Sequence, residues 1–338
     1  MTSRQAEAPL RKAGAAPMAR ALWHVLPGRA ELRVNTVPAP GEGEAVARTL
    51  FSAISRGTER LVSDGRVPES EYAAMRAPLQ EGDFPFPVKY GYCAVARVEA
   101  GPRNLVGRTI FALHPHQDLF VAPVSMMAVV PETVPAARAV LAANMETALN
   151  ALWDSGAGPG DRIVIFGGGA VGLLIAHLSA ALPGAEVTLI DPDASRAPIA
   201  MAFGARYSSD AGAVRDADVV FHASATSAGL AAAITACGNE ARLVEMSWYG
   251  DRAIETPLGG AFHAKRLQIV SSQVGQVSPS RRPRWSHARR LAKALDLLAD
   301  ARLDMLLGER VAFANLAEEL PRLLAPGAPG VVPLVVYD

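Results

Sequence analysis

The chain has 338 residues, of which 50% are apolar and 20% are charged. This length and composition fit one large or two ordinary globular domains with a sizeable buried core. The 33 basic and 33 acidic residues cancel, so the net charge gives no electrostatic case for binding nucleic acid or an anionic membrane surface. Two cysteines, Cys93 and Cys237, are too few for a disulfide framework or a four-thiolate zinc site.

Residues 1–19 predict a loose, alanine-rich leader. Arg4, Arg11 and Lys12 interrupt this segment, so it lacks the continuous apolar stretch of a secretory signal peptide. The uncharged stretch 163–182 has the length of a membrane span, but glycines interrupt it after four apolar residues. A buried strand, a glycine turn and a buried helix explain that stretch better. We therefore expect no membrane span and a cytoplasmic location.

Residues 21–135 predict mostly strands with irregular connections, because short apolar runs alternate with Pro and Gly clusters. The predicted strands include 44–54, 91–100, 109–113 and 119–124. The alanine-rich stretch 132–154 predicts one or two helices.

From residue 161 onward, predicted strands and helices alternate, which is typical of a parallel, doubly wound sheet in an α/β protein. The predicted elements are strands 163–166, 187–190, 218–222, 241–246 and 267–271, and helices 170–182, 194–203 and 286–298. A final strand is predicted at 331–337, and it needs a sheet to join. We therefore expect a discontinuous first domain, residues 20–147 and 276–338, with the α/β domain 148–275 inserted into it.

The segment Gly167-Gly168-Gly169-Ala170-Val171-Gly172 matches the pattern G-x-G-x-x-G between an apolar strand and a helix. This is the context that a dinucleotide-binding turn requires. Gly167 permits the tight turn, Gly169 lets the backbone approach a pyrophosphate, and Gly172 allows the helix to pack closely on the strand. The N–H groups at the helix start, including Ala170 and Val171, are expected to face the phosphates. The alternative is a glycine-rich turn without a ligand.

Asp191 ends the second predicted strand, 19 residues after Gly172, where a carboxylate binds the adenosine ribose. Because a carboxylate repels a 2′-phosphate, this position favours NAD over NADP. Arg196 follows five residues later and is a candidate to pack on the adenine or its phosphate, which weakens the preference.

With these motifs, the chain resembles the medium-chain dehydrogenase/reductase superfamily over about residues 20–338. Residues 158–162 are similar to the entry to that family's nucleotide domain, 53–59 to its first catalytic loop and 90–99 to its second catalytic segment. The Ile-Ser-x-Gly-Thr-Glu loop is similar to that of a subgroup that includes bacteriochlorophyllide hydroxyethyl dehydrogenase. The resemblance implies a GroES-like, mostly-β catalytic domain and a Rossmann domain.

The resemblance also implies a catalytic zinc, but two of the three ligand positions have changed. Arg56 stands at a cysteine position and Tyr92 at a histidine position, while Glu146 matches the third ligand. A guanidinium cannot coordinate zinc and repels it. The four-cysteine structural lobe is missing as well, because residues 111–124 contain no cysteine. We therefore expect no zinc.

Arg56 is a candidate to stabilise a developing alkoxide in place of the metal, and Tyr92 a candidate to supply a proton. In this hypothesis Arg56 lowers the pKa of Tyr92. Thr58 matches a hydroxyl in the relatives' proton relay. The alternatives are an ion pair of Arg56 with Glu146 or Glu59, and a Tyr92 that only packs in the core.

Other segments add candidate contacts. His114 and His116 face one side if the segment is a strand, and they are a second candidate for proton transfer, the alternative being structural histidines. Thr147 is a candidate cofactor contact. The aromatic residues in 247–251 are expected to wall the nicotinamide site. The arginines and the tryptophan in 281–285 suit an anionic or aromatic substrate, or belong to a solvated loop.

Together these features predict a zinc-independent, NAD-linked oxidoreductase that interconverts an alcohol and a carbonyl. The alternatives are a quinone or enoyl reductase that uses NADPH, which Asp191 disfavours, and a dinucleotide-binding protein without turnover. The expected partner is a small-molecule substrate, with no nucleic acid and no membrane. We also expect a homodimer joined edge to edge through the last parallel strand, at 267–270.

Overall fold

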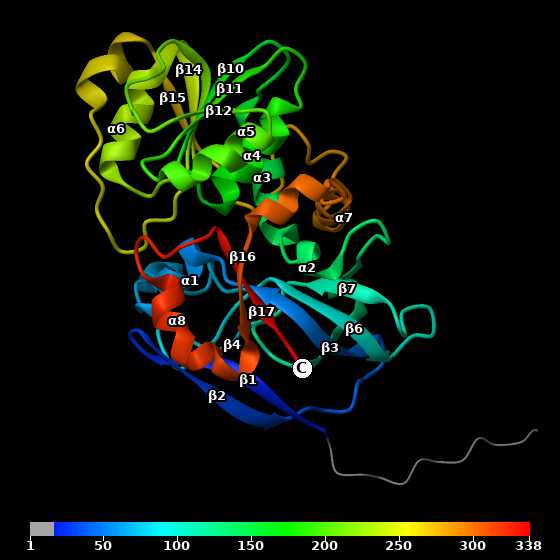
Figure 1. The fold of residues 1–338 in the computed structure, drawn as a ribbon. Coiled ribbons are helices and arrows are strands. Elements are labelled where there is room, and N and C mark those ends of the chain that lie inside the picture. The colour runs from blue at the N-terminus through cyan, green and yellow to red at the C-terminus, as the bar shows by residue number, and fades with distance from the viewer. Residues whose placement is uncertain (1–16) are drawn as a thin grey trace, which may run out of the picture.

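The computed structural model describes residues 17–338, which form two units stacked one above the other (Figure 1). The upper unit contains a parallel sheet, and the lower unit contains two mostly antiparallel sheets. Residues 1–16 of the expected leader lie outside the described residues. The predicted end of the leader at residue 19 is wrong, because strand β1 (Met18–Leu26) begins at Met18 and pairs with β2 (Arg29–Thr36).

A six-stranded, wholly parallel sheet forms the upper unit, as predicted. In spatial order its strands are β12 (Arg206–Ser208), β11 (Glu186–Ile190), β10 (Arg162–Phe166), β13 (Ala217–His222), β14 (Cys237–Glu245) and β15 (Gln268–Ser271). Strand β10 lies between β11 and β13, so the direction of winding reverses there. Ligands of such sheets bind at the carboxyl ends of the strands beside this switch point.

Helices cover both faces of the parallel sheet. They are α3 (Ala142–Ser155), α4 (Ala170–Ala180), α5 (Ala197–Ala202) and α6 (Ser227–Ala236), while α7 (His287–Leu297) packs against α3. The sequence predicts α4 because it is apolar on nearly all sides, and Leu173, Ile175 and Ala176 are fully buried. Helix α6 was not predicted, since its small residues give only a weak periodic pattern.

The lower unit contains the first described strands and the last strand of the chain. One sheet has the order β2, β1, β5 (Val88–Lys89), β4 (Glu81–Gly82). The other has the order β16 (Leu307–Ala312), β17 (Val332–Val336), β3 (Glu44–Ala53), β6 (Ala94–Ala100), β7 (Thr109–Ala112), β9 (Met127–Val129), with β8 (Leu119–Pro123) paired to β3. Strand β17 pairs antiparallel with β3, so the chain's end returns to the sheet of its N-terminal part.

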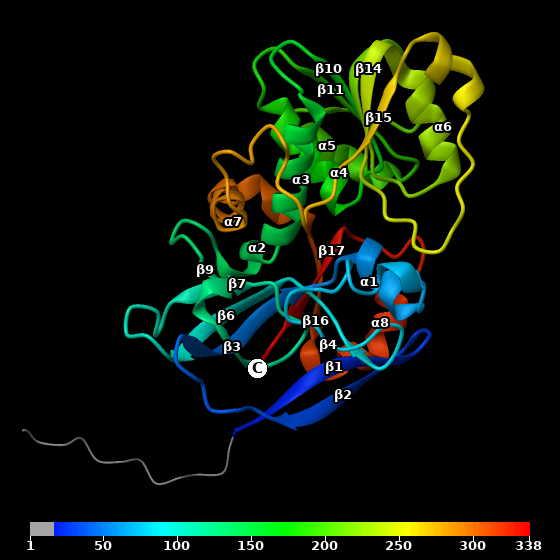
Figure 2. The same cartoon turned by 180° about the vertical axis from the view of Figure 1, so that it is seen from behind.

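Short helices interrupt the strands of the lower unit: α1 (Arg56–Ser63), α2 (Ala136–Ala139) and α8 (Leu316–Leu324). The expectation of irregular connections is therefore wrong at 56–63, which is helical. Helix α8 buries Leu316, Leu320 and Leu323, spaced as one face of a helix requires. Figure 2 shows α1 and α8 side by side at one flank, with α2 and α3 between the two units.

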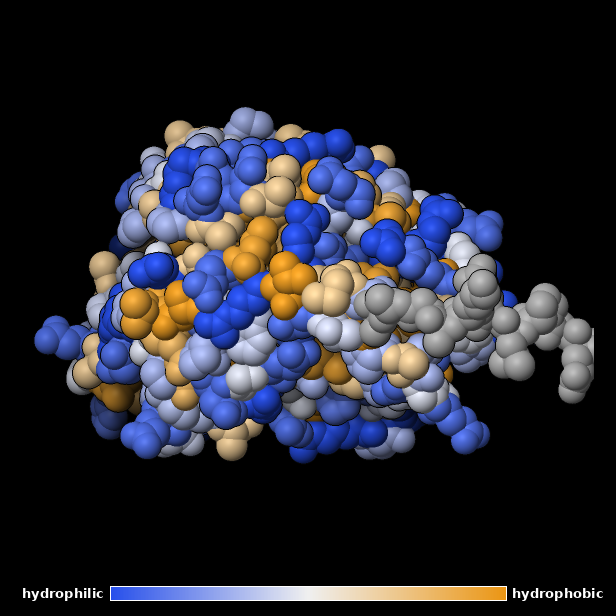
Figure 3. All heavy atoms as spheres, turned by 90° about the horizontal axis from the view of Figure 1, so that it is seen from below, coloured by the Kyte–Doolittle hydropathy of each residue, from blue (hydrophilic) through white to orange (hydrophobic). Residues whose placement is uncertain are grey.

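A single cluster of buried apolar residues runs through both units. It includes Val95 and Phe111 of the lower unit, Met145 of α3, and Ile165 and Leu174 of the upper unit. The two units therefore share a packed core around α3. The outer face of the lower unit is mostly hydrophilic, with hydrophobic residues in small groups (Figure 3). Within residues 17–338, no helix has both the length and the apolar character that crossing a membrane requires.

Candidate dinucleotide and substrate site

In the glycine turn between β10 and α4, the glycines at the two ends have no room for a side chain, whereas Gly169 between them is exposed. Gly167 has a φ of +109°, and a Cβ there would lie 2.8 Å from the backbone nitrogen of Ser224. A Cβ on Gly172 would lie 1.9 Å from the carbonyl oxygen of Gly167. Gly169 is exposed, and no atom lies within 4 Å of a Cβ built on it. The turn therefore leaves room for a ligand against its backbone at Gly169.

The start of α4 offers N–H groups beside this open position. The first helical bond is donated by Leu173 to the carbonyl of Gly169, and no side chain caps the helix. Ala170 and Val171 are partly exposed. Because the N-terminus of a helix carries a partial positive charge and unpaired N–H groups, it suits the pyrophosphate of a dinucleotide.

Asp191 and Arg196 both lie beside Gly168. One carboxylate oxygen of Asp191 accepts from the Gly168 N–H at 2.6 Å, and the other accepts from the Asp193 N–H at 2.8 Å. Arg196 packs against Gly168 and pairs with Asp193, with Nη2 and Oδ2 3.1 Å apart. Asp191 thus lies at the turn, as the ribose-binding hypothesis requires, while the charge of Arg196 already has an acidic partner.

Arg56 is bound by the chain's C-terminal segment. Its guanidinium donates to the carbonyl oxygens of Leu323, Ala328, Pro329 and Gly330, at distances of 2.6 to 3.0 Å. The alternative of an ion pair with Glu146 or Glu59 is wrong, because those carboxylates pair with Arg290 and His116. Burial is the main cause that lowers the pKa of Arg56. Four backbone carbonyls accept from most of its N–H donors.

Tyr92 lies beside two hydroxyl groups of the segment 53–59, the first catalytic loop of the sequence analysis. Its phenol lies close to the side-chain hydroxyls of Ser55 and Thr58 at the start of α1, and both act to lower its pKa. Burial raises the pKa of Tyr92 well above its usual value, and Arg56 is not among the groups that shift it. The predicted lowering of this pKa by Arg56 is therefore wrong. Tyr92 and Thr58 remain partly exposed, so the hydroxyl cluster is accessible.

Glu146 lies in a buried contact away from Tyr92. Its Oε1 accepts from Nε of Arg290 in α7 at 2.9 Å, and Arg290 also donates to Asn150 at 2.6 Å. Burial raises the pKa of Glu146, although Arg290 opposes the shift. Thr147 donates to the carbonyl of Ala143 within α3 and is partly exposed. The structure thus does not bring Glu146 together with Arg56 and Tyr92.

His116 belongs to a buried polar chain inside the lower unit. Its Nε2 lies 2.9 Å from a carboxylate oxygen of Glu59, and its Nδ1 lies 2.7 Å from Oγ of Ser52, which is 2.9 Å from the hydroxyl of Tyr337. His114 stacks on Phe120, and burial lowers its pKa to about 3. The two histidines lie in a loop, and only His116 contacts the first catalytic loop.

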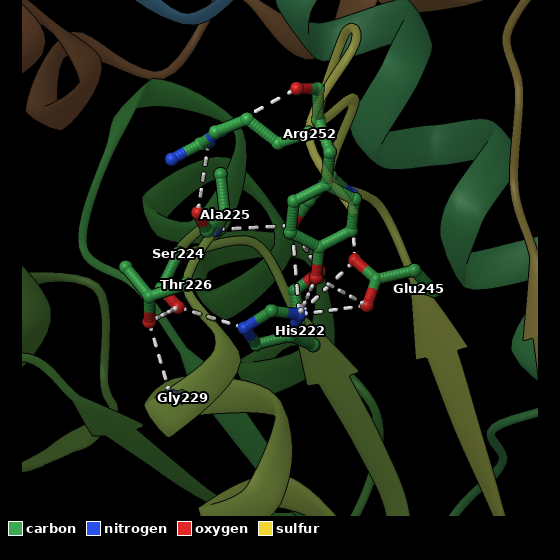
Figure 4. A network of polar contacts seen from close by, with 9 residues as sticks. His222, Ser224, Ala225, Thr226, Gly229, Glu245 and Arg252 are labelled. Carbon is green, nitrogen blue, oxygen red and sulfur yellow. Dashed lines mark hydrogen bonds and ion pairs between the residues drawn. The ribbon is translucent and has the colours of Figure 1, made fainter. Parts of the chain in front are cut away.

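A second polar network, missed by the sequence analysis, lies at the carboxyl ends of β13 and β14 (Figure 4). Nδ1 of His222 lies 2.8 Å from Oε2 of Glu245, and its Nε2 lies 2.7 Å from Oγ of Ser224. Glu245 also accepts from the Ser247 N–H at 2.7 Å and from the Tyr249 hydroxyl at 3.0 Å. The sequence signal for this network was a polar residue, His222 or Glu245, at the end of each of two predicted strands.

The loop after β14 connects this network to the lower unit, where both cartoon views draw it beside α1 (Figures 1 and 2). Asp251 pairs with Arg66 at 2.6 Å. Trp248 packs against the same apolar cluster as Tyr92. The half of the parallel sheet that contains β13 and β14 therefore adjoins the Tyr92 hydroxyl cluster.

The segment 281–285 lies against α3. Arg281 stacks over Trp153, whose ring centroid is 4.8 Å from that of Trp285, and Arg289 stacks over Trp285. These cation–π contacts occupy the faces of both indoles. The segment therefore packs on the outside of α3 and contacts neither Tyr92 nor the glycine turn.

The donor set at the expected metal position does not fit zinc. Tyr92 is protonated, Arg56 is a cation, and Cys93 is a buried thiol whose pKa burial raises well above its usual value. Zinc requires thiolate, neutral imidazole or carboxylate ligands. Among residues 17–338, no three His, Cys, Asp or Glu side chains come together as a metal site.

No family model and no curated protein sequence matches the chain. Solved structures do match over nearly its whole length. L-idonate 5-dehydrogenase from Escherichia coli K-12 has a TM-score of 0.77 at 14% identity, over 95% of this chain and 99% of that one. A putative zinc-binding dehydrogenase from Sinorhizobium meliloti bound to NADP has a TM-score of 0.76 at 17% identity, with the same coverage.

A short chain alcohol dehydrogenase from E. coli CFT073, in complex with NADH, has a TM-score of 0.75 at 16% identity, over 95% of this chain and 99% of that one. At these identities the likeness shows the fold. The predicted fold class is therefore confirmed: a GroES-like, mostly-β unit and a Rossmann unit with a doubly wound parallel sheet.

Replacing Arg56 with methionine removes four charge-assisted hydrogen bonds to the C-terminal segment. We expect Arg56→Met to lower the free energy of unfolding by about 2–3 kcal/mol, measured by denaturant unfolding. The dissociation constant for NADH should stay within about twofold, because the glycine turn is untouched. In the control Arg48→Met, which breaks only the exposed pair with Glu99, the loss should be under about 1 kcal/mol. Parental stability with lost turnover would instead support a catalytic Arg56.

Proposed function

We propose that this chain is a zinc-independent, NAD-linked oxidoreductase that interconverts an alcohol and a carbonyl. The proposal rests on two features at the carboxyl edge of the parallel sheet. The glycine turn lies at the switch point, and the hydroxyl cluster of Tyr92, Ser55 and Thr58 lies beside the other half of this edge. The solved structures of similar fold include dehydrogenases bound to NADH and NADP, which supports this assignment.

The residues of the turn fit a dinucleotide, which supplies or accepts the hydride when bound. The open backbone at Gly169 and the helix start at Ala170 and Val171 hold the pyrophosphate. Asp191 binds the adenosine ribose, and the aliphatic part of Arg196 packs beside Gly168. Thr147, partly exposed on α3, is a further candidate contact.

Tyr92 is the proposed proton donor. The phenol is protonated at neutral pH and can donate its proton to a carbonyl oxygen during reduction, although burial, which raises its pKa, makes it a weaker acid. Ser55 and Thr58 orient the hydroxyl and link it toward solvent through Thr58. His116 and Glu59 act indirectly through Ser55, because the Glu59 carboxylate accepts from the Ser55 N–H at 2.7 Å.

The proposed assembly is a homodimer joined through β15, the outer strand of the parallel sheet. Its Ile269 is 37% exposed, and pairing with a second copy would cover this edge. The proposed domain limits are 20–147 with 276–338, and 148–275.

The function is tested by supplying NAD⁺ with a panel of secondary alcohols and NADH with cyclic and aromatic ketones. With any active substrate, Tyr92→Phe should lower kcat roughly 10²–10³-fold while the NADH dissociation constant is unchanged, because only the proton donor is lost. Tyr72→Phe changes a tyrosine whose ring is tilted against that of Phe84 in the same cluster; it serves as the control and should keep its kcat. Turnover only of quinones or enones with NADPH, or binding without any turnover, would contradict the proposal.

The NAD preference follows from the Asp191 carboxylate. We expect Asp191→Ala to reduce the ratio of NADP to NAD dissociation constants by roughly tenfold, since it removes a charge that repels the 2′-phosphate. Fluorescence titration of both cofactors measures this ratio. Glu186→Ala, at the opposite end of β11, removes an equal charge and should leave the ratio unchanged. Tighter binding of NADP than of NAD by the parental protein would refute the preference.

The zinc prediction rests on the donor set around Tyr92 and Arg56. Protein purified without chelator should hold far less than about one zinc per chain, because a cation and a protonated phenol supply no ligand. Elemental analysis measures the content, and activity should survive dialysis against a chelator. A tightly held zinc in stoichiometric amount would overturn the prediction.

A further inference from the structure

Glu245 places a carboxylate in the half of the parallel sheet that receives the nicotinamide nucleoside. A doubly wound sheet of this kind is built from two mononucleotide-binding halves. The glycine turn and Asp191 follow β10 and β11 in the first half, whereas His222 and Glu245 end β13 and β14 in the second. The Ser224 backbone lies directly against Gly167, so the network adjoins the turn.

The carboxylate of Glu245 is held in its ionised form. Its side chain is only 15% exposed, and this burial acts to raise its pKa. The hydrogen bonds from His222 and from the Ser247 N–H outweigh burial, so the pKa of Glu245 lies below its usual value. The Tyr249 hydroxyl adds a third donor. Three donors converging on one carboxylate fix both its charge and its position.

His222 is fully buried against this carboxylate, and two further neighbours are Tyr249 and Arg252. The pKa of Tyr249 is raised by burial and by Glu245, so its phenol stays neutral. Arg252, the remaining charged neighbour, is exposed and donates to the carbonyl of Ala225 at 3.2 Å. Solvent screens its charge more than that of a buried group.

An oxidised nicotinamide ring carries a positive charge, whereas the reduced ring is neutral. We propose that Glu245, positioned by His222, Ser247 and Tyr249, discriminates between the two redox forms of the bound cofactor by attracting the oxidised ring. This inference rests on the proposed function, because it requires a nicotinamide dinucleotide at the turn. Preference for the oxidised form favours the products of carbonyl reduction, which is the direction suited to a protonated Tyr92.

The test compares the dissociation constants of NAD⁺ and NADH at pH 8, by fluorescence titration and without substrate. Glu245→Gln should raise the ratio of the NAD⁺ constant to the NADH constant roughly tenfold, because it removes a negative charge that favours the oxidised ring. Glu245→Asp keeps the charge and should keep the ratio within about threefold. Glu255→Gln makes the same change at an exposed position of the following loop and should leave the ratio unchanged.

A glutamine can accept from Ser247 and donate to His222, so we expect the Glu245→Gln variant to fold. If its unfolding transition is lost, the double variant His222→Gln with Glu245→Gln removes the same charge and should give the same rise. An unchanged ratio in a folded variant that still binds both forms overturns this inference alone. Failure of the parental protein to bind either form overturns the proposed function, and this inference with it.

Discussion

The junction between the two units depends on the hydrogen bonds that the buried guanidinium of Arg290 donates. This side chain is 1% exposed and donates to Glu146 and Asn150 of α3 and to the carbonyls of Val274 and Gln276. It therefore ties α7, α3 and the segment leaving β15 into one cluster beside the shared core. A buried charge is tolerated only when its donors are paired, and breaking such a pair typically costs about 3–5 kcal/mol. The same pairing engages one carboxylate oxygen of Glu146.

The first catalytic loop shows how a site without zinc ligands is held together. Arg56 and Arg60 bind carbonyls of the segment after α8, and Glu59 binds the Ser55 N–H and His116. Arg56 and Arg60, about one helical turn apart, thus bind the C-terminal segment, whereas Glu59 joins the buried polar chain. These contacts fix the backbone at Ser55, whose hydroxyl meets Tyr92.

The sequence predicted features set by local sterics and missed those set by distant partners. The roles of Gly167 and Gly172 in the turn could be predicted, because a Cβ at either position would clash with nearby backbone. The partners of Arg56 lie 267 or more residues away, and Glu146 and Arg290 are 144 residues apart. No spacing rule predicts such pairs, because they depend on how the C-terminal segment returns to the lower unit. The parallel sheet was predicted for the same reason as the turn, since strand and helix periodicity is local.

The carboxyl edge of the parallel sheet carries a charge pattern that matches a dinucleotide along its length. Asp191 lies at one end of the pattern and Glu245 in the other half, each fixed by backbone N–H donors. Between them, the start of α4 presents the positive end of a helix at the exposed Gly169. A pyrophosphate is anionic, a ribose offers hydroxyl donors, and an oxidised nicotinamide ring is cationic. Negative, positive and negative groups in this order are complementary to that ligand, whereas any one of them alone would suit many others.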